Sequence, residues 1–217
     1  DPESGMRLIN LFLKENIKVI EASAFATVTP ELVYFRLKNL TKDSSGNPMP
    51  KQHIMAKLSR HDVAEKFLSP PPKQIVMKLL SSELITQEEA ELSNLIPVAS
   101  DITVESDSGG HTDRGNPYVL TPSILNLRDK LTAKFSYKAP IHIGAAGGLG
   151  TPQSVAASFI MGVDYILTGS INQCTIESGT SDTVKDILSA ININDTTYAP
   201  AGDMFEFGAK VQVIKKK

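Results

Sequence analysis

The chain has no tryptophan, a single cysteine and no long apolar run. One cysteine, Cys174, excludes an internal disulfide framework and fits a reducing compartment. Because no histidine is close to it in the sequence, we interpret Cys174 as a small packed side chain rather than a nucleophile. No apolar run approaches the ~18 residues of a membrane span, and no signal-like segment opens the chain. These absences predict a cytoplasmic protein with no membrane contact.

Neither sign of charge is in excess. The 217 residues include 22 Lys and Arg against 24 Asp and Glu, a formal net charge of -2. This balance argues against a general nucleic-acid or membrane surface. His111 and Asp113 lie two residues apart, and no other His or Cys spacing suits zinc, so we predict no metal site. With 41% hydrophobic residues, the chain is long enough to bury a globular core.

Five short apolar runs alternate with helical patterns. Alternation of this kind predicts a parallel sheet buried on both faces. Two of the helices are expected to begin at a proline that follows a threonine, Thr29-Pro30 and Thr151-Pro152. The predicted strands cover residues 17–22, 53–58, 102–105, 141–145 and 165–168.

Two segments interrupt the alternation. Residues 42–48 form a polar turn cluster, which predicts an exposed loop. Residues 70–97 read as an inserted helical hairpin with segments at 75–80 and 86–95, the second opened by a Thr86-to-Glu89 capping box. The hairpin is either a covering element or a lid or docking surface beside the strand ends, and both readings stay open.

Charged side chains within the predicted strands are candidates for chemistry. Lys57 ends the strand at 53–58, where it is expected to face the mouth of the sheet and an anionic ligand or polarised ring, or else to reach solvent along the surface. His53 and His61 flank this strand and are expected to face solvent. His142 alternates with isoleucines and is expected to lie in the core.

Three glycine-bearing segments predict a ligand site. Gly109 and Gly110 come directly before His111, so a ligand can approach backbone beside a titratable imidazole. Gly147 and Gly148 lie between a strand and the helix that Thr151 opens, where amide donors and a helix N-terminus suit a phosphate. The run 168–170 repeats a glycine and a hydroxyl at the next strand end, as in the phosphate site of barrel enzymes. The alternative is that these segments are close-packing turns without a ligand.

These segments, in their order and spacing, resemble the FMN-dependent nitronate monooxygenase and flavin enoyl-ACP reductase family. A narrower resemblance, to the trans-acting enoyl reductases of polyketide and polyunsaturated fatty acid synthases, covers nearly the whole chain. It is carried by the runs at 56–60, 105–113, 168–173 and 199–206.

The resemblance implies a TIM (β/α)8 barrel of the FMN-binding type. The chain would be a partial barrel over residues 1–217, covering about the carboxyl-terminal five β/α units, with the 70–97 hairpin inserted in it. Family members carry about three further strands ahead of residue 17, which are expected outside this chain. Unpaired edges left by those units would favour association, so a homo-oligomer stays open.

The resemblance also implies an activity and its residues. FMN, reduced by NADH or NADPH, would deliver a hydride to the β carbon of an enoyl thioester on an acyl carrier protein that serves polyketide synthase modules. His111 would polarise the thioester carbonyl or supply the proton, and Lys57 would lie near the flavin. The cofactor-binding residues would be Gly109, Gly110, Ala146, Gly147, Gly148, Thr168, Gly169 and Ser170. A nitronate monooxygenase, or a noncatalytic fragment or carrier-protein docking module, remains an alternative.

Overall fold

The computed structural model describes residues 2–23, 26–202, 208 and 210–215. Residues 203–206 of the 199–206 motif therefore lie outside the described residues. The chain forms two compact units, the first from Asp1–Thr103 and Ser123–Ile143 and the second from Val104–Pro122 and Gly144–Lys217. We call them unit 1 and unit 2, and describe each by itself.

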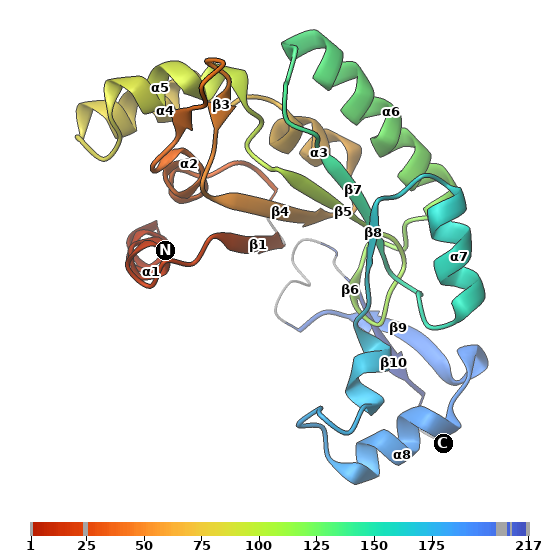
Figure 1. The fold of residues 1–217 in the computed structure, drawn as a ribbon. Helices are drawn as coiled ribbons and strands as arrows, with labels where there is room; N and C mark the ends of the chain where they lie inside the picture. Colours follow the sequence, from red (N-terminus) through yellow and green to blue (C-terminus); the bar gives the residue numbers. More distant parts are fainter. Residues whose placement is uncertain (1, 24–25, 203–207, 209, 216–217) are drawn as a thin grey trace. The chain divides into compact units, whose positions relative to one another are not determined.

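A five-stranded parallel sheet is present, as predicted from the apolar runs, and its strands lie in the order β1-β4-β5-β7-β8 (Figure 1). The register of β1 against β4 pairs Val19 with His53 and Ser23 with Lys57. Each strand begins and ends within two residues of its predicted bounds. The strands are β1 (Val19–Ser23), β4 (His53–Leu58), β5 (Asp101–Glu105), β7 (His142–Ala146) and β8 (Tyr165–Leu167).

The helices of unit 1 follow the predicted order. Helix α2 begins at Pro30, with Thr29 in the extended conformation before it. Both α2 and α3 pack on β4, whose Ile54, Ala56 and Leu58 are buried. The helices with a segment in unit 1 are α1 (Pro2–Lys14), α2 (Pro30–Leu37), α3 (His61–Leu68), α4 (Lys73–Ser81), α5 (Gln87–Leu92), η1 (Ser93–Leu95) and α6 (Pro117–Phe135), the last of which begins in unit 2.

Helices α4 and α5 occupy the segment predicted as an inserted hairpin. The Thr86 side chain accepts a hydrogen bond from the Glu89 amide, and the Glu89 carboxylate accepts one from the Thr86 amide, which is the expected capping box. Glu89 also accepts a hydrogen bond from the Asn39 amide at 2.6 Å, and the Lys38 ammonium donates to the Leu84 carbonyl at 2.8 Å. These bonds fix the hairpin on the end of α2. A lid or docking role for it stays a prediction.

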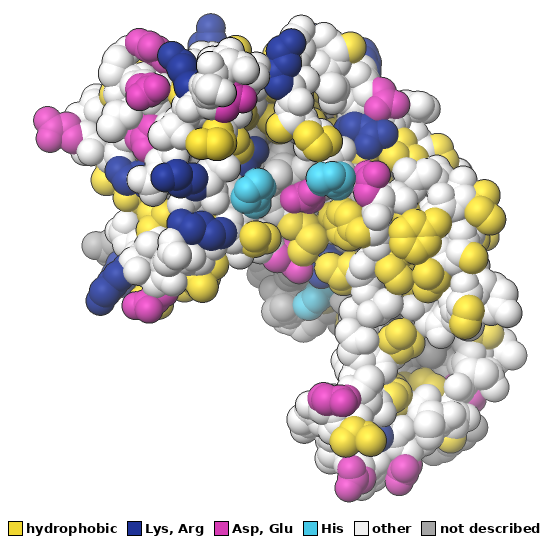
Figure 2. Space-filling model, in the orientation of Figure 1, with side chains coloured by type: hydrophobic (Ala, Val, Ile, Leu, Met, Phe, Trp, Pro, Cys, Tyr) yellow, Lys and Arg dark blue, Asp and Glu magenta, His cyan; other side chains and the backbone are white. Residues whose placement is uncertain are grey.

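The turn cluster at 42–48 is exposed over residues 42–46, as predicted, and the structure adds a short strand on each side of it. It is the tip of a small hairpin formed by β2 (Thr41–Lys42) and β3 (Pro48–Met49). The Asp43 carboxylate accepts hydrogen bonds from the Ser45 and Asn47 amides, which closes the turn. On the face of unit 1 in Figure 2, basic side chains lie among acidic ones, in keeping with the small net charge.

Unit 2 contains a three-stranded antiparallel sheet of order β6-β10-β9 that the sequence patterns did not predict. The sheet pairs a segment near residue 111 with strands at 210–214 and 196–200, as the register of Val211 with His111 and with Ala199 shows. Besides β8, the ends of β5 and β7 and the start of α6, the elements of unit 2 are β6 (Gly110–Thr112), α7 (Pro152–Ile160), η2 (Ser170–Cys174), α8 (Asp182–Ala190), η3 (Ile193–Asp195), β9 (Thr196–Pro200) and β10 (Lys210–Ile214).

Candidate functional site

His111 lies in the middle of β6, in unit 2. Its side chain is exposed, whereas that of the next residue, Thr112, is buried. Gly110 precedes it with a φ of +101°, and a Cβ built there would meet no atom of the described residues within 4 Å. The positive φ requires glycine, and the open space lets another molecule approach the backbone beside the imidazole.

The loop at Gly147 and Gly148 packs against the segment that leads to His111. A Cβ on Gly147 would lie 2.6 Å from the Ser106 carbonyl oxygen and 2.9 Å from that of Asp107, and φ is +94°. Residue 147 must therefore be glycine for two independent reasons. The Ser106 amide also donates to the Ala146 carbonyl at 2.9 Å, which joins the two segments directly.

The third segment, residues 168–170, reaches the same place. The Ser170 hydroxyl lies 2.6 Å from the position of a Cβ on Gly109, so these two residues are in close contact. A Cβ on Gly169 would meet no atom within 4 Å. The structure therefore brings the three predicted glycine-bearing segments together within unit 2.

Fewer hydrogen-bond donors are available to a phosphate than the sequence indicated. At the start of α7, the Thr151 and Ser154 side chains cap each other's backbone amides, and Pro152 has no N–H. The Gly150 amide donates to the Gly148 carbonyl at 3.1 Å. Within the described part of the chain, no hydrogen bond is found for the Gly147 and Gly148 amides. Loop amides and the Ser170 hydroxyl thus fit a phosphate better than the N-terminus of α7 does.

Thr168 and Ala146 contribute mainly backbone to the site. The Thr168 hydroxyl donates to the Asn172 side-chain oxygen at 3.1 Å, and the Asn172 amide group donates to the Thr168 carbonyl at 3.0 Å. These bonds hold the turn that leads to Ser170. Ala146 is buried and ends β7, where its carbonyl accepts the Ser106 amide.

Lys57 belongs to unit 1, whereas the glycine-bearing segments belong to unit 2. Its ammonium is 3.5 Å from the Glu21 carboxylate, and its side chain is 23% exposed. The Ser23 hydroxyl donates to the same carboxylate. Glu21 was missed by the sequence reasoning, although a carboxylate within the apolar run Val19-Ile20-Glu21-Ala22 was a signal that could have found it.

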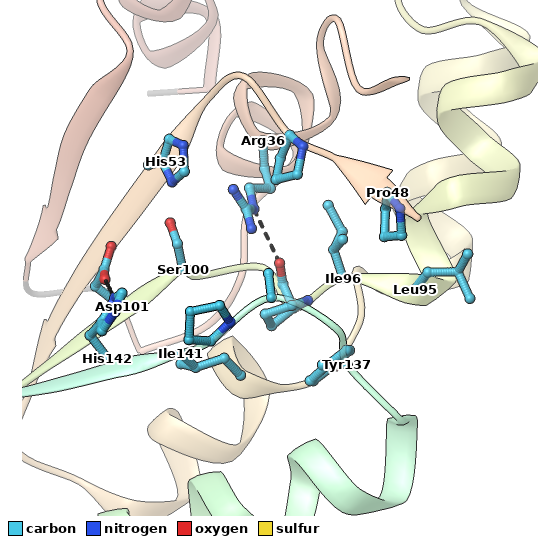
Figure 3. Close-up of a pocket in the computed structure, with 14 residues that line it drawn as sticks. Arg36, Pro48, His53, Leu95, Ile96, Ser100, Asp101, Tyr137, Ile141 and His142 are labelled. Atoms are coloured by element: carbon cyan, nitrogen blue, oxygen red, sulfur yellow. Dashed lines mark hydrogen bonds and ion pairs between the residues drawn. The ribbon is translucent and has the colours of Figure 1, made fainter. Parts of the chain in front are cut away.

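Unit 1 also contains a cavity of about 200 Å³ (Figure 3). Figure 3 shows Arg36, from α2, directed into it, and Nε of Arg36 donates to the Pro97 carbonyl at 3.2 Å. Burial lowers the pKa of Arg36 to about 10. The cavity is lined by His53, Asp101 and His142, the first residues of β4, β5 and β7. Parallel sheets bind ligands at the carboxyl ends of their strands, so this cavity at the amino ends is not the candidate active site.

Two sequence expectations are wrong. His142 is not a core residue, because it is the first residue of β7, where its half-exposed ring pairs with Asp101 at 2.9 Å. Cys174 is exposed at the end of η2 rather than packed. His53 departs in part from its expectation, since it is half-buried in the cavity wall.

Neither a metal centre nor a membrane span is found among the described residues. No group of three His, Cys, Asp or Glu side chains there could hold a metal ion. No described helix is long and apolar enough to cross a membrane.

The fold and the arrangement of these loops define an α/β protein with a parallel sheet, similar to a solved enoyl reductase domain. That domain belongs to MlnA, from the macrolactin biosynthesis cluster of Bacillus amyloliquefaciens. The TM-score is 0.94 at 45% sequence identity, over 99% of this chain and 48% of the solved chain. No protein-family model matches the chain.

Curated relatives place the chain more closely. It is 52% identical over 214 residues to the polyketide biosynthesis protein PksE of Bacillus subtilis, a match of 99% of this chain and 28% of PksE. It is 45% identical over 210 residues to one component of the polyunsaturated fatty acid synthase of Thraustochytrium, covering 96% of this chain and 14% of that component. The chain is homologous to these proteins, as the resemblance predicted, and spans less than a third of the length of each.

Proposed function

We propose that this chain is part of an FMN-dependent enoyl reductase that acts on enoyl thioesters of an acyl carrier protein. The observation that carries the proposal is the 45% identity to the MlnA enoyl reductase domain over 99% of the chain. Polyketide and polyunsaturated fatty acid synthase proteins among the relatives support a substrate carried by a synthase, with polyketide synthase modules as partners. NADH or NADPH is the proposed reductant.

The proposed architecture is a (β/α)8 barrel of the FMN-binding type. Five parallel strands with β1 and β8 at the two edges of the sheet support it, because a barrel of eight strands would pair both edges. The solved MlnA chain extends beyond the matched region, which leaves room there for further β/α units.

The glycine-bearing segments of unit 2 are the proposed cradle for the FMN phosphate. The backbone amides of Gly147 and Gly148 and the Ser170 hydroxyl supply hydrogen-bond donors. Gly169 adds no side chain, and no described atom lies within 4 Å of a Cβ built there. When bound, FMN would supply the redox chemistry, the transfer of a hydride equivalent from the nicotinamide to the β carbon.

His111 is the proposed acid of the reaction. Its exposed imidazole sits on β6 beside the open backbone of Gly110, so it can donate a hydrogen bond to the thioester carbonyl or a proton to the α carbon. Lys57 is a second candidate, with its ammonium held by Glu21. Its charge would favour a negative group on the substrate or cofactor.

A substitution at Gly169 tests the cradle. Gly169→Val should weaken FMN binding by at least about tenfold, or 1.4 kcal/mol, because the new side chain starts from a position with no described atom within 4 Å, which the proposal assigns to the cofactor. Gly179→Val is the matched control, since a Cβ at Gly179 also meets nothing within 4 Å. FMN affinity would be measured by fluorescence titration and the fold by thermal unfolding of the intact protein. Equal affinities in the two variants would contradict the assignment.

Gly147 is a poorer test, because a side chain there collides with the chain's own backbone whether or not a ligand binds.

The activity itself is tested by mixing the photoreduced intact protein with an enoyl-acyl carrier protein in the absence of oxygen. Reoxidation of the flavin with formation of the saturated thioester is expected. Oxygen-dependent turnover of a nitroalkane without NADPH would favour a nitronate monooxygenase instead, and absence of a flavin band from the purified intact protein would favour a noncatalytic docking module.

A further inference from the structure

Asp107 lies at the junction of the segments that form the candidate site. Its amide donates to the Gly115 carbonyl at 3.0 Å, and the preceding Ser106 amide donates to Ala146 at 2.9 Å. The Asp107 carbonyl oxygen is in turn the surface against which Gly147 packs. The main chain at Asp107 is therefore fixed between the proposed phosphate loop and the loop that follows His111.

The Asp107 carboxylate connects β6 and β9, the two edge strands of the β6-β10-β9 sheet. One oxygen accepts the Thr112 hydroxyl at 2.8 Å, and the other accepts the Tyr198 phenol from β9. The Thr112 hydroxyl also accepts the Arg114 amide at 2.9 Å. Because Thr112 follows His111 directly and is buried, these bonds hold the carboxyl end of β6.

Tyr198 reaches Asp107 past the central strand of this sheet. Gln212 of β10 is paired with Tyr198 on one side and with Gly110 on the other. The Arg114 guanidinium lies 5.5 Å from the centre of the Tyr198 ring. The hydrogen bond to Asp107 raises the pKa of Tyr198, with burial and the Asp107 charge adding to it, as expected for a phenol that stays protonated and donates.

His111 is also held along β6 by its pairing with Val211 of β10. On its amino side, Gly110 has a positive φ and no described atom lies within 4 Å of a Cβ built there, and the Ser108 hydroxyl contacts the His111 carbonyl at 3.5 Å. On the carboxyl side of His111, the bond from the Thr112 hydroxyl to the Asp107 carboxylate adds a side-chain restraint at the next residue.

We propose that Asp107 is a positioning residue that sets the direction of His111 relative to the 147–148 loop, with Tyr198 as its anchor in the carboxyl-terminal hairpin. This inference rests on the proposed function of His111. It makes residues 196–200 part of the machinery of the site, although they come almost ninety residues after His111 in the sequence.

Tyr198→Phe in the intact, FMN-loaded protein tests the proposal. The ring and its contact with Arg114 remain, and only the hydrogen bond to Asp107 is removed. We expect the single-turnover reduction of an enoyl-acyl carrier protein to slow about tenfold, while FMN affinity changes less than threefold. Tyr118→Phe is the matched control, because Tyr118 is 69% exposed at the start of α6, and it should leave both quantities unchanged.

The effect must depend on His111. In a His111→Ala background, Tyr198→Phe should slow the reaction no further, since residues that act through one another are not additive. Asp107→Asn should behave like Tyr198→Phe and should not add to it. A tenfold loss in both backgrounds, or no loss in either, would overturn the proposal.

A second measurement separates this inference from the proposed function. The rate at which diethyl pyrocarbonate modifies His111, followed by mass spectrometry, should change more than threefold in Tyr198→Phe and in Asp107→Asn, with His61 as the internal reference. His61 is exposed and lies in unit 1. If the wild-type protein reduces no enoyl thioester, the proposed function fails, and the modification rate alone decides the positioning role. An unchanged His111 rate in both variants would overturn it.

Discussion

Units 1 and 2 differ in where their apolar residues lie. Unit 1 contains every one of the largest fully buried side chains found among the described residues, namely Phe35, Phe67, Leu37, Leu40, Ile54, Leu68, Leu92, Ile102, Ile124, Leu131, Ile143 and Gln52. In the described part of unit 2, the buried apolar residues are small or few: Val104, Ala145, Ala146, Val163 and Ala201. Unit 2 also exposes Ile160, Ile176 and Ile193 by more than 80%.

This difference indicates that stability and ligand binding depend on different units. Unit 1 is held by a packed core, whereas unit 2 carries the glycine-bearing segments and positive-φ backbone of the candidate site. Backbone that approaches a ligand closely has no side chains with which to build a core. We therefore expect the stability of the protein to depend on unit 1 and its ligand affinity on unit 2.

The largest effect on stability is expected from a substitution in the core of unit 1. Phe67→Ala should lower the free energy of unfolding by about 3–5 kcal/mol, because Phe67 is 1% exposed in α3 and its removal leaves a cavity. Phe159→Ala is the control, since Phe159 is also helical, in α7 of unit 2, but 48% exposed. Urea unfolding of the intact protein would measure both. A loss for Phe159→Ala as large as that for Phe67→Ala would contradict the contrast between the units.

A smaller effect on stability is expected from substituting two glycines of similar conformation. Gly46 in unit 1 has φ +81° with open space, and Gly147 in unit 2 has φ +94° with the Ser106 carbonyl oxygen 2.6 Å from a built Cβ. Gly46→Ala should cost about 1–2 kcal/mol, the penalty of the left-handed conformation alone. Gly147→Ala should cost more, because the backbone at Ser106 and Asp107 must also move. Thermal unfolding of both variants measures the difference, and equal losses would show that the close packing at Gly147 adds nothing.

The same contrast explains what the sequence could predict. The strands of the parallel sheet, the proline-started helices and the Thr86 capping box depend on short-range patterns, and the structure confirms them. The β6-β10-β9 sheet depends on pairing between residues about a hundred positions apart, such as His111 and Val211, which no local period reveals. For that reason Tyr198 was not recognised as a partner of Asp107. His142 was misplaced because alternation with Ile141 and Ile143 indicates a strand without showing that its first residue lies at the open end.

The smallest expected effect concerns His53, in the cavity of unit 1. Burial, and then the charge of Arg36, lower the pKa of His53, while Asp101 opposes the shift. His142, which also lines the cavity, is paired with Asp101. Because the folded state binds a proton less readily than the unfolded chain, His53 should favour folding above its unfolded pKa of about 6.5. It should lose this contribution as the pH falls from there through its lower folded-state pKa. The melting temperature of wild-type protein should therefore drop more between pH 7.5 and 5.5 than that of His53→Gln.

His61→Gln, at an exposed position on α3, is the control and should follow the wild type. Parallel curves for all three proteins would mean that the charges of this cavity contribute nothing to the stability of unit 1.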